Sequence, residues 1–135
     1  MLVDKLALMS QLSHDKPTVL VVEDEFFIRA DAADMVRDLG FEAIEAIDAD
    51  HAISLLEAID EIAVVFTDIQ MPGSMDGLRL VTVIRDRWPP IAILVTSGQL
   101  SPSTQDLPAG ARFLPKPYLI GHLKMHLDAL LEPAP

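Results

Sequence analysis

The sequence contains no cysteine, which excludes disulfide bonds and thiolate metal sites. Basic residues are also scarce, because ten Lys and Arg face twenty-one Asp and Glu, for a formal net charge of −11. Such a charge repels nucleic-acid phosphates and anionic membrane surfaces, so we expect neither as a direct partner. No apolar run approaches the roughly 20 residues of a membrane span, and the first residues show no basic start or cleavage site for export. We therefore expect a cytoplasmic protein.

The length of 135 residues suits one domain. From Thr18 onward, short β-branched runs alternate with segments of helical periodicity, a pattern that predicts parallel strands joined by crossover helices. Five such units predict an α/β fold with a doubly wound, five-stranded parallel sheet. The expected strands are 18–22, 41–46, 62–67, 91–95 and 111–114, and the expected helices are 26–39, 49–59, 78–88 and 117–131.

Two segments do not follow this pattern. The fourth crossover, 97–110, has few periodic apolar positions, which predicts a short or irregular fourth helix. Residues 1–16 are expected to be an N-terminal extension, either disordered or a short helix, before a domain spanning 17–132. We expect no output domain after it. The predicted inward faces of the first and last helices are Ile28, Ala32, Met35, Val36 and Leu39, and Leu119, Leu123, Leu127 and Leu130.

Polar side chains follow four of the predicted strands at the point where each ends. In an open parallel α/β sheet, ligands bind beyond the carboxyl ends of the strands, so these residues can act together. They comprise an acidic run after the first strand, an aspartate after the third, hydroxyls after the fourth and a lysine after the fifth: Glu23-Asp24-Glu25, Asp68, Thr96-Ser97 and Lys116-Pro117. The sequence thus predicts that acids, a hydroxyl and an amine converge.

Carboxylates forced together repel each other and either take up protons or recruit a hard cation, for which oxygen ligands with open water positions favour Mg²⁺. The cation would keep Asp68 ionised as a nucleophile toward a phosphoryl group, and Lys116 would bind a phosphoryl oxygen. Taken singly, these features have ordinary explanations. Acids at a helix start favour its dipole, Thr96 suits a turn, and a Lys-Pro dipeptide suits the start of a helix. Their joint placement favours a functional site.

These residues resemble the receiver domains of two-component response regulators, over about residues 18–131. The family has an acidic pair after strand one, an aspartate followed by Met-Pro and Asp-Gly after strand three, a Thr or Ser after strand four and a Lys-Pro after strand five. The corresponding residues are Glu23-Asp24, Asp68 with Met71-Pro72 and Asp76-Gly77, Thr96, and Lys116-Pro117. The resemblance implies a flavodoxin-like (βα)5 fold with strand order 2-1-3-4-5.

The resemblance also implies roles for particular residues. Asp68 corresponds to the phosphorylation site, and Mg²⁺ would be bound by Asp24 and Asp68, by Glu23 through water, and by the backbone carbonyl of Gln70. Lys116 corresponds to the phosphoryl clamp, and the Lys116-Pro117 peptide is expected to be cis. Thr96 and Phe113 correspond to the switch pair, although for Phe113 core packing is an equal alternative. The phosphodonor would be a sensor histidine kinase or a histidine phosphotransfer protein. The output would be a contact with a downstream protein target. Weak pairing with a second copy of the chain is also expected.

Two departures affect loops around this site. The segment Gly73-Ser74-Met75 is one residue longer than the commonest family spacing, and the weak fourth helix reduces a face that the family uses for contacts. Two other classes remain open: a Mg²⁺-dependent phosphatase with an aspartyl nucleophile, and a binding module independent of phosphorylation. Such a phosphatase usually has an acid two residues after its nucleophile, where this chain has Gln70. We therefore expect a phosphoacceptor switch rather than an enzyme with turnover. The four histidines, His14, His51, His122 and His126, are interpreted as incidental, with the last two facing solvent.

Overall fold

Five parallel strands form one sheet in a computed structural model of the chain, which describes residues 16–73, 75–98 and 107–132. The strand order is β2-β1-β3-β4-β5, and every neighbouring pair is parallel. The predicted fold class is therefore confirmed. The strands are β1 Thr18–Val22, β2 Glu42–Ala46, β3 Ile62–Asp68, β4 Ala92–Ser97 and β5 Arg112–Pro115.

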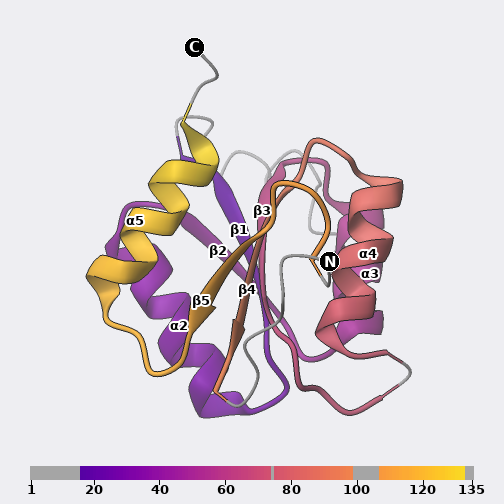
Figure 1. Cartoon of the computed structure of the whole chain (residues 1–135), viewed down its shortest axis with the longest axis horizontal. Helices are drawn as coiled ribbons and strands as arrows, with labels where there is room; N and C mark the ends of the chain where they lie inside the picture. Colours follow the sequence, from indigo (N-terminus) through magenta and orange to yellow (C-terminus); the bar gives the residue numbers. More distant parts are fainter. Residues whose placement is uncertain (1–15, 74, 99–106, 133–135) are drawn as a thin grey trace, which may run out of the picture.

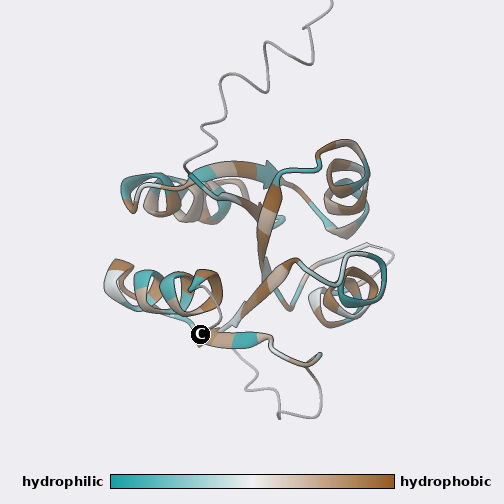
Figure 2. Cartoon of the chain, turned by 90° about the horizontal axis from the view of Figure 1, so that it is seen from above, coloured by the Kyte–Doolittle hydropathy of each residue, from teal (hydrophilic) through white to brown (hydrophobic). Residues whose placement is uncertain are grey.

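Helices cover both faces of the sheet (Figure 1). Within the described residues they are α2 Phe26–Asp38, α3 Ala49–Ala58, α4 Gly77–Arg87 and α5 Ile120–Leu131. Helices α2 and α5 pack on one face and α3 and α4 on the other, with a separate apolar core on each side. Figure 2 shows this arrangement from above, with hydrophobic residues on the strands between the helices. Burial from both faces explains why β1 is apolar almost throughout.

Local sequence signals set several helix ends. Asp48 and Asp76 are the N-caps of α3 and α4, and their carboxylates accept hydrogen bonds from the backbone N–H of His51 at 2.8 Å and of Arg79 at 2.9 Å. Such bonds satisfy donors that a helix start otherwise leaves unpaired. Gly40 follows α2 with φ +94°, the left-handed conformation that favours glycine after a helix. The helices expected at 26–39 and 49–59 therefore agree with α2 and α3 to within one residue at each end.

Two predicted core positions are wrong. Ile28 is 45% exposed, whereas Ala33 in the same helix is fully buried. Leu119 is 70% exposed, because α5 begins at Ile120 and not at Pro117 as expected. Both residues lie next to the carboxyl ends of the strands, where the sheet no longer offers a surface to pack against. These exposed apolar groups therefore surround the edge at which the polar residues gather.

Several predictions fall outside the described part of the chain. These are the structure of residues 1–15 and most of the fourth crossover, at 99–106. In the loop of the longer spacing, Gly73 has φ +113°, while Ser74 is outside the description. Within the residues that the structure describes, no helix is long and apolar enough to cross a membrane.

Candidate functional site

The ammonium group of Lys116 joins two acids that are far apart in the sequence. Its Nζ lies 2.8 Å from Oδ2 of Asp68 and 3.2 Å from Oε1 of Glu23. The side chains are 23% exposed for Lys116, 11% for Asp68 and 6% for Glu23, so the contacts are largely shielded from water. The Lys116-Pro117 peptide is cis, as the family resemblance implied. Three predicted site residues therefore meet at the carboxyl ends of β1, β3 and β5.

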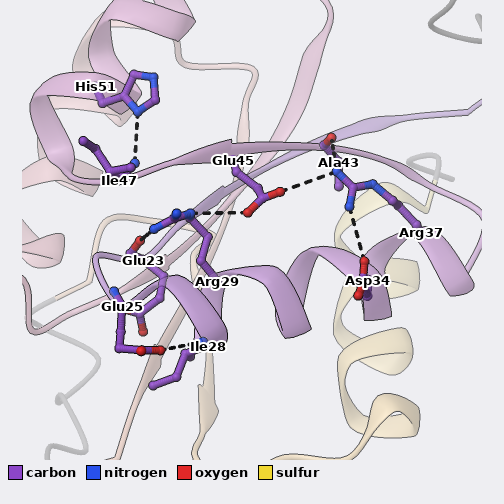
Figure 3. A network of polar contacts seen from close by, with 10 residues as sticks. All are labelled: Glu23, Glu25, Ile28, Arg29, Asp34, Arg37, Ala43, Glu45, Ile47 and His51. Carbon is purple, nitrogen blue, oxygen red and sulfur yellow. Dashed lines mark hydrogen bonds and ion pairs between the residues drawn. The ribbon is translucent and has the colours of Figure 1, made fainter.

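Glu23 is held by contacts to each of its polar atoms. Its Oε2 accepts a hydrogen bond from the backbone N–H of Glu25 at 3.0 Å, and its own N–H donates to the carbonyl of Ala46 at 3.1 Å. Its carbonyl accepts from Nη1 of Arg29 at 2.9 Å (Figure 3). With Lys116 on Oε1, the residue is fixed by β2, by α2 and by the loop after β5.

Asp68 is the last residue of β3, and its backbone is packed tightly against the start of α4. A Cβ atom on Gly77 would lie 2.0 Å from the carbonyl oxygen of Asp68, so only glycine fits there without displacement. The N–H of Gly77 donates to the carbonyl of Ile69 at 2.8 Å. Oδ1 of Asp68 accepts from the backbone N–H of Gln70 at 3.1 Å. The glycine of the Asp-Gly motif, Gly77, thus packs against the backbone of Asp68 and fixes its position at the end of β3.

Thr96 lies beside Asp68 in the sheet, where the two are register partners of β4 and β3. It is 4% exposed, and its hydroxyl has no hydrogen-bond partner within the described part of the chain. A buried hydroxyl without a partner is costly, so the group is ready to accept or donate when a polar atom arrives. Phe113 is half-buried and packs against the core on the α3 and α4 side. Core packing is therefore its contact in this structure.

Burial governs the electrostatics of the site. It raises the pKa of Glu23 to about 7, helped by hydrogen bonding to Asp24 and Asp68 and opposed by the backbone N–H of Glu25 and the charge of Lys116. Burial alone lowers the pKa of Lys116, but the hydrogen bond and charge of Asp68, together with Glu23, outweigh it and raise that pKa above its usual value. With Glu23 and Asp68 both ionised, the site would contain two negative charges next to the single positive charge of Lys116.

The donor atoms suit a hard divalent cation. Glu23 and Asp68 supply carboxylate oxygens at one point, and exposed Asp24 is close enough to raise the pKa of Glu23. The backbone carbonyl of exposed Gln70 is the fourth predicted ligand. Within the described residues, no three acidic or histidine side chains are already arranged as a metal cluster. An ion at this point would add positive charge, which the raised pKa of Glu23 shows to be favourable, because it would stabilise the ionised carboxylates.

Two residues near the site were missed by sequence reasoning. Tyr118 lines a small cavity beside Asp68 and packs edge-on against Phe66, with 5.8 Å between ring centroids. Burial, with the charges of Asp31, Glu23 and Asp68, raises the pKa of Tyr118 to about 12. Arg29 is the second missed residue, although an arginine one helical turn after an acidic run was a possible signal.

All three histidines in the described part of the chain have specific partners, and Nδ1 of His122 accepts a hydrogen bond from the backbone N–H of Leu119 at 3.2 Å. Nδ1 of His51 accepts a hydrogen bond from the backbone N–H of Ile47 at 3.0 Å. His126 is half-buried, and its Nδ1 accepts from Nε of Arg112 at 2.8 Å. The expectation that His126 faces solvent is therefore wrong, whereas His122 is exposed as expected.

A family comparison assigns most of the chain to a known domain family. Residues 19–128 match the model of the response regulator receiver domain. This covers most of the chain, so the protein belongs to the response regulator receiver domain family, the class to which two-component phosphoacceptor switches belong.

Individual relatives agree with this assignment. The chain is 33% identical over 119 residues to the sensor kinase CckA of Brucella abortus, covering 85% of this chain and 12% of the kinase. It is 32% identical over 126 residues to the protein PetR of Rhodobacter capsulatus, covering 92% of this chain and 52% of PetR. The chain thus spans about half or less of the length of these relatives.

Solved structures show the same architecture. The receiver domain of the hybrid histidine kinase CckA superposes with a TM-score of 0.72 at 32% identity, covering 85% of this chain and 99% of that domain. NtrX from Brucella abortus superposes with a TM-score of 0.78 at 31% identity, covering 87% of this chain and 27% of NtrX.

Proposed function

We propose that this receiver domain accepts a phosphoryl group on Asp68 from a histidine kinase or a phosphotransfer protein. The observation that carries the proposal is the contact of Lys116 Nζ with both Asp68 and Glu23 at the carboxyl edge of the sheet. A shielded carboxylate next to a buried acid and a lysine is an arrangement suited to phosphoryl transfer, which depends mainly on positioning and charge. Family membership supports it.

In the transfer, an oxygen of Asp68 attacks the phosphorus and forms the new P–O bond. The P–N bond to the donor's imidazole breaks at the same time, and the imidazole nitrogen keeps the electron pair of that bond. Oδ2 is bound by Lys116 and Oδ1 by the N–H of Gln70, so both oxygens begin in defined positions. Mg²⁺, held by Glu23, Asp24 and Asp68 with the carbonyl of Gln70, would supply the charge that offsets the phosphoryl dianion.

After transfer, Lys116 keeps its position beside Asp68 and binds a phosphoryl oxygen. The Thr96 hydroxyl, which has no hydrogen-bond partner among the described residues, then gains an acceptor, which favours movement of the β4 end toward Asp68. Phe113 lies on the neighbouring strand, where β5 pairs with β4, and would repack into the space that Thr96 vacates. The resulting change in surface would be the output signal to a protein partner.

Exposed apolar side chains around the site suit a protein donor. Phe26 is 60% exposed, Phe27 76% and Leu119 70%, and they lie in the first turn of α2 and before α5. Large apolar groups at the rim of a polar pocket commonly mark a protein contact. The formal net charge of −11 makes nucleic acid a poor alternative partner.

A mass measurement tests the proposal. The protein is incubated with acetyl phosphate with and without Mg²⁺, and we expect a gain of one phosphoryl group that requires Mg²⁺ and is absent in Asp68→Asn. Asp76→Asn is the matched control, because Asp76 is exposed and caps α4, and asparagine can cap a helix equally well. No gain in the wild type contradicts the proposal, and sustained hydrolysis of an aryl phosphate would identify a phosphatase instead.

A further inference from the structure

Arg29 is a buried cation that touches the acidic loop without belonging to the phosphoacceptor set. The residue is 9% exposed and lies one turn into α2. Its Nη1 donates to the carbonyl of Glu23 at 2.9 Å, and its Nε donates to Oε1 of Glu45 in β2 at 3.3 Å (Figure 3). Its guanidinium carbon lies 5.5 Å from the ring centroid of Phe26. One side chain therefore connects the residue after β1, the start of α2 and the carboxyl-terminal part of β2.

The carbonyl contact controls a particular peptide group. The carbonyl of Glu23 and the N–H of Asp24 share one plane, so fixing the oxygen fixes the direction in which the chain enters Asp24. The other contacts of Glu23 hold its own N–H and its carboxylate, to Ala46, Glu25 and Lys116. Among the hydrogen bonds that Glu23 makes within the described residues, the Arg29 bond is the one made to the peptide group that leads to Asp24.

We infer that Arg29 is a positioning residue for the cation site, which it serves by holding the peptide between Glu23 and Asp24 so that both carboxylates face Asp68. The inference rests on the proposed function, because it assigns a task within that site. Glu45 largely neutralises the guanidinium, so the contribution of Arg29 is geometric more than electrostatic. The planar guanidinium of arginine can donate to two acceptors at once in a fixed geometry, which a lysine ammonium group cannot reproduce.

The test compares two arginines of the same helix. Arg37 likewise donates to a backbone carbonyl, that of Ala43 in β2 at 3.2 Å, and lies 3.8 Å from Oε2 of Glu45, but its hydrogen bonds and ion pairs within the described residues do not include Glu23. Arg29→Met and Arg37→Met each keep an apolar stem and remove the guanidinium. Mg²⁺ affinity is measured calorimetrically without phosphodonor, and urea unfolding in EDTA gives the stability of each metal-free variant.

We expect Arg29→Met to weaken Mg²⁺ binding by about 10- to 100-fold, the usual effect of removing an outer-shell partner. Arg37→Met should change it by less than about threefold, since exposed arginine contacts contribute little. Arg29→Lys should resemble Arg29→Met, and it also serves if the methionine variant does not fold. Amide exchange at Asp24 and Glu25, followed by NMR without metal, should accelerate in the Arg29 variants alone.

Three results would overturn the inference. These are unchanged Mg²⁺ affinity in a folded Arg29 variant, full rescue by lysine, or a loss in Arg37→Met equal to that in Arg29→Met, which would indicate a general stability effect. Failure of the proposed function looks different, because wild-type protein would then bind no Mg²⁺ and acquire no phosphoryl group.

Discussion

Replacing Glu23 by glutamine should make the metal-free protein more stable at pH 8. The pKa of Glu23 is raised from 4.5 to about 7, chiefly by burial, so the folded protein binds this proton more tightly than the unfolded chain does. At about 1.36 kcal/mol per tenfold change in proton affinity, ionising Glu23 in the folded state costs roughly 3 kcal/mol. Above pH 7 the wild type carries this cost in full, and it carries none below pH 4.5, where the carboxyl is protonated in both states.

Glutamine removes the charge but has one acceptor oxygen, whereas the two oxygens of Glu23 accept from Lys116 and from Glu25. Losing one of these bonds costs about 1 kcal/mol. The net gain at pH 8 is therefore about 2 kcal/mol, or a rise in melting temperature of about 5–10 °C for a domain of this size. The gain should diminish as the pH falls from 7 to 4.5.

Urea unfolding followed by circular dichroism, in EDTA and at several pH values, measures this difference directly. With Mg²⁺ at about 100 times its Kd, the wild type should gain about 2.7 kcal/mol, and Glu23→Gln should gain less because it has lost a cation ligand. A variant less stable than the wild type at pH 8 without metal would refute the account of a crowded acidic site. A pH-independent difference would show that ionisation of Glu23 is not its cause.

Three further variants test other parts of the structure. Gly77→Ala should cost about 1–3 kcal/mol in urea unfolding and slow phosphoryl uptake, because the added methyl group displaces the backbone of Asp68; an unchanged stability would contradict the close approach. Thr96→Val should stabilise the metal-free protein by about 1 kcal/mol, since it removes a hydroxyl that is unpartnered within the described residues, and a loss of stability would reveal a partner. Burial and the charge of Arg112 lower the pKa of His126, and protonation of His126 would break its hydrogen bond with Arg112. His126→Gln should therefore lose less stability than the wild type when the pH falls below 6.5. Identical pH profiles for the two proteins would argue against this.

Strand and helix positions could be predicted because the periodicity of apolar residues reflects burial directly. Asp48 and Gly40 marked helix ends for local reasons, a capping carboxylate and a left-handed backbone. Ile28 and Leu119 were assigned wrongly to the core, because periodicity continues past the point where the sheet ends. Whether an apolar residue meets a strand or solvent depends on neighbours that are distant in the sequence.

The sequence by itself determined the order of the elements and the identity of the acids, hydroxyl and amine that follow the strands. The tertiary structure decided which of them touch, since Lys116 lies 48 residues from Asp68 and 93 from Glu23. It also decided the contacts of Arg29, whose two acceptors are Glu23, just after β1, and Glu45 in β2. Hydrogen bonds and pKa values depend on distance and burial, and both arise only when separate segments pack together.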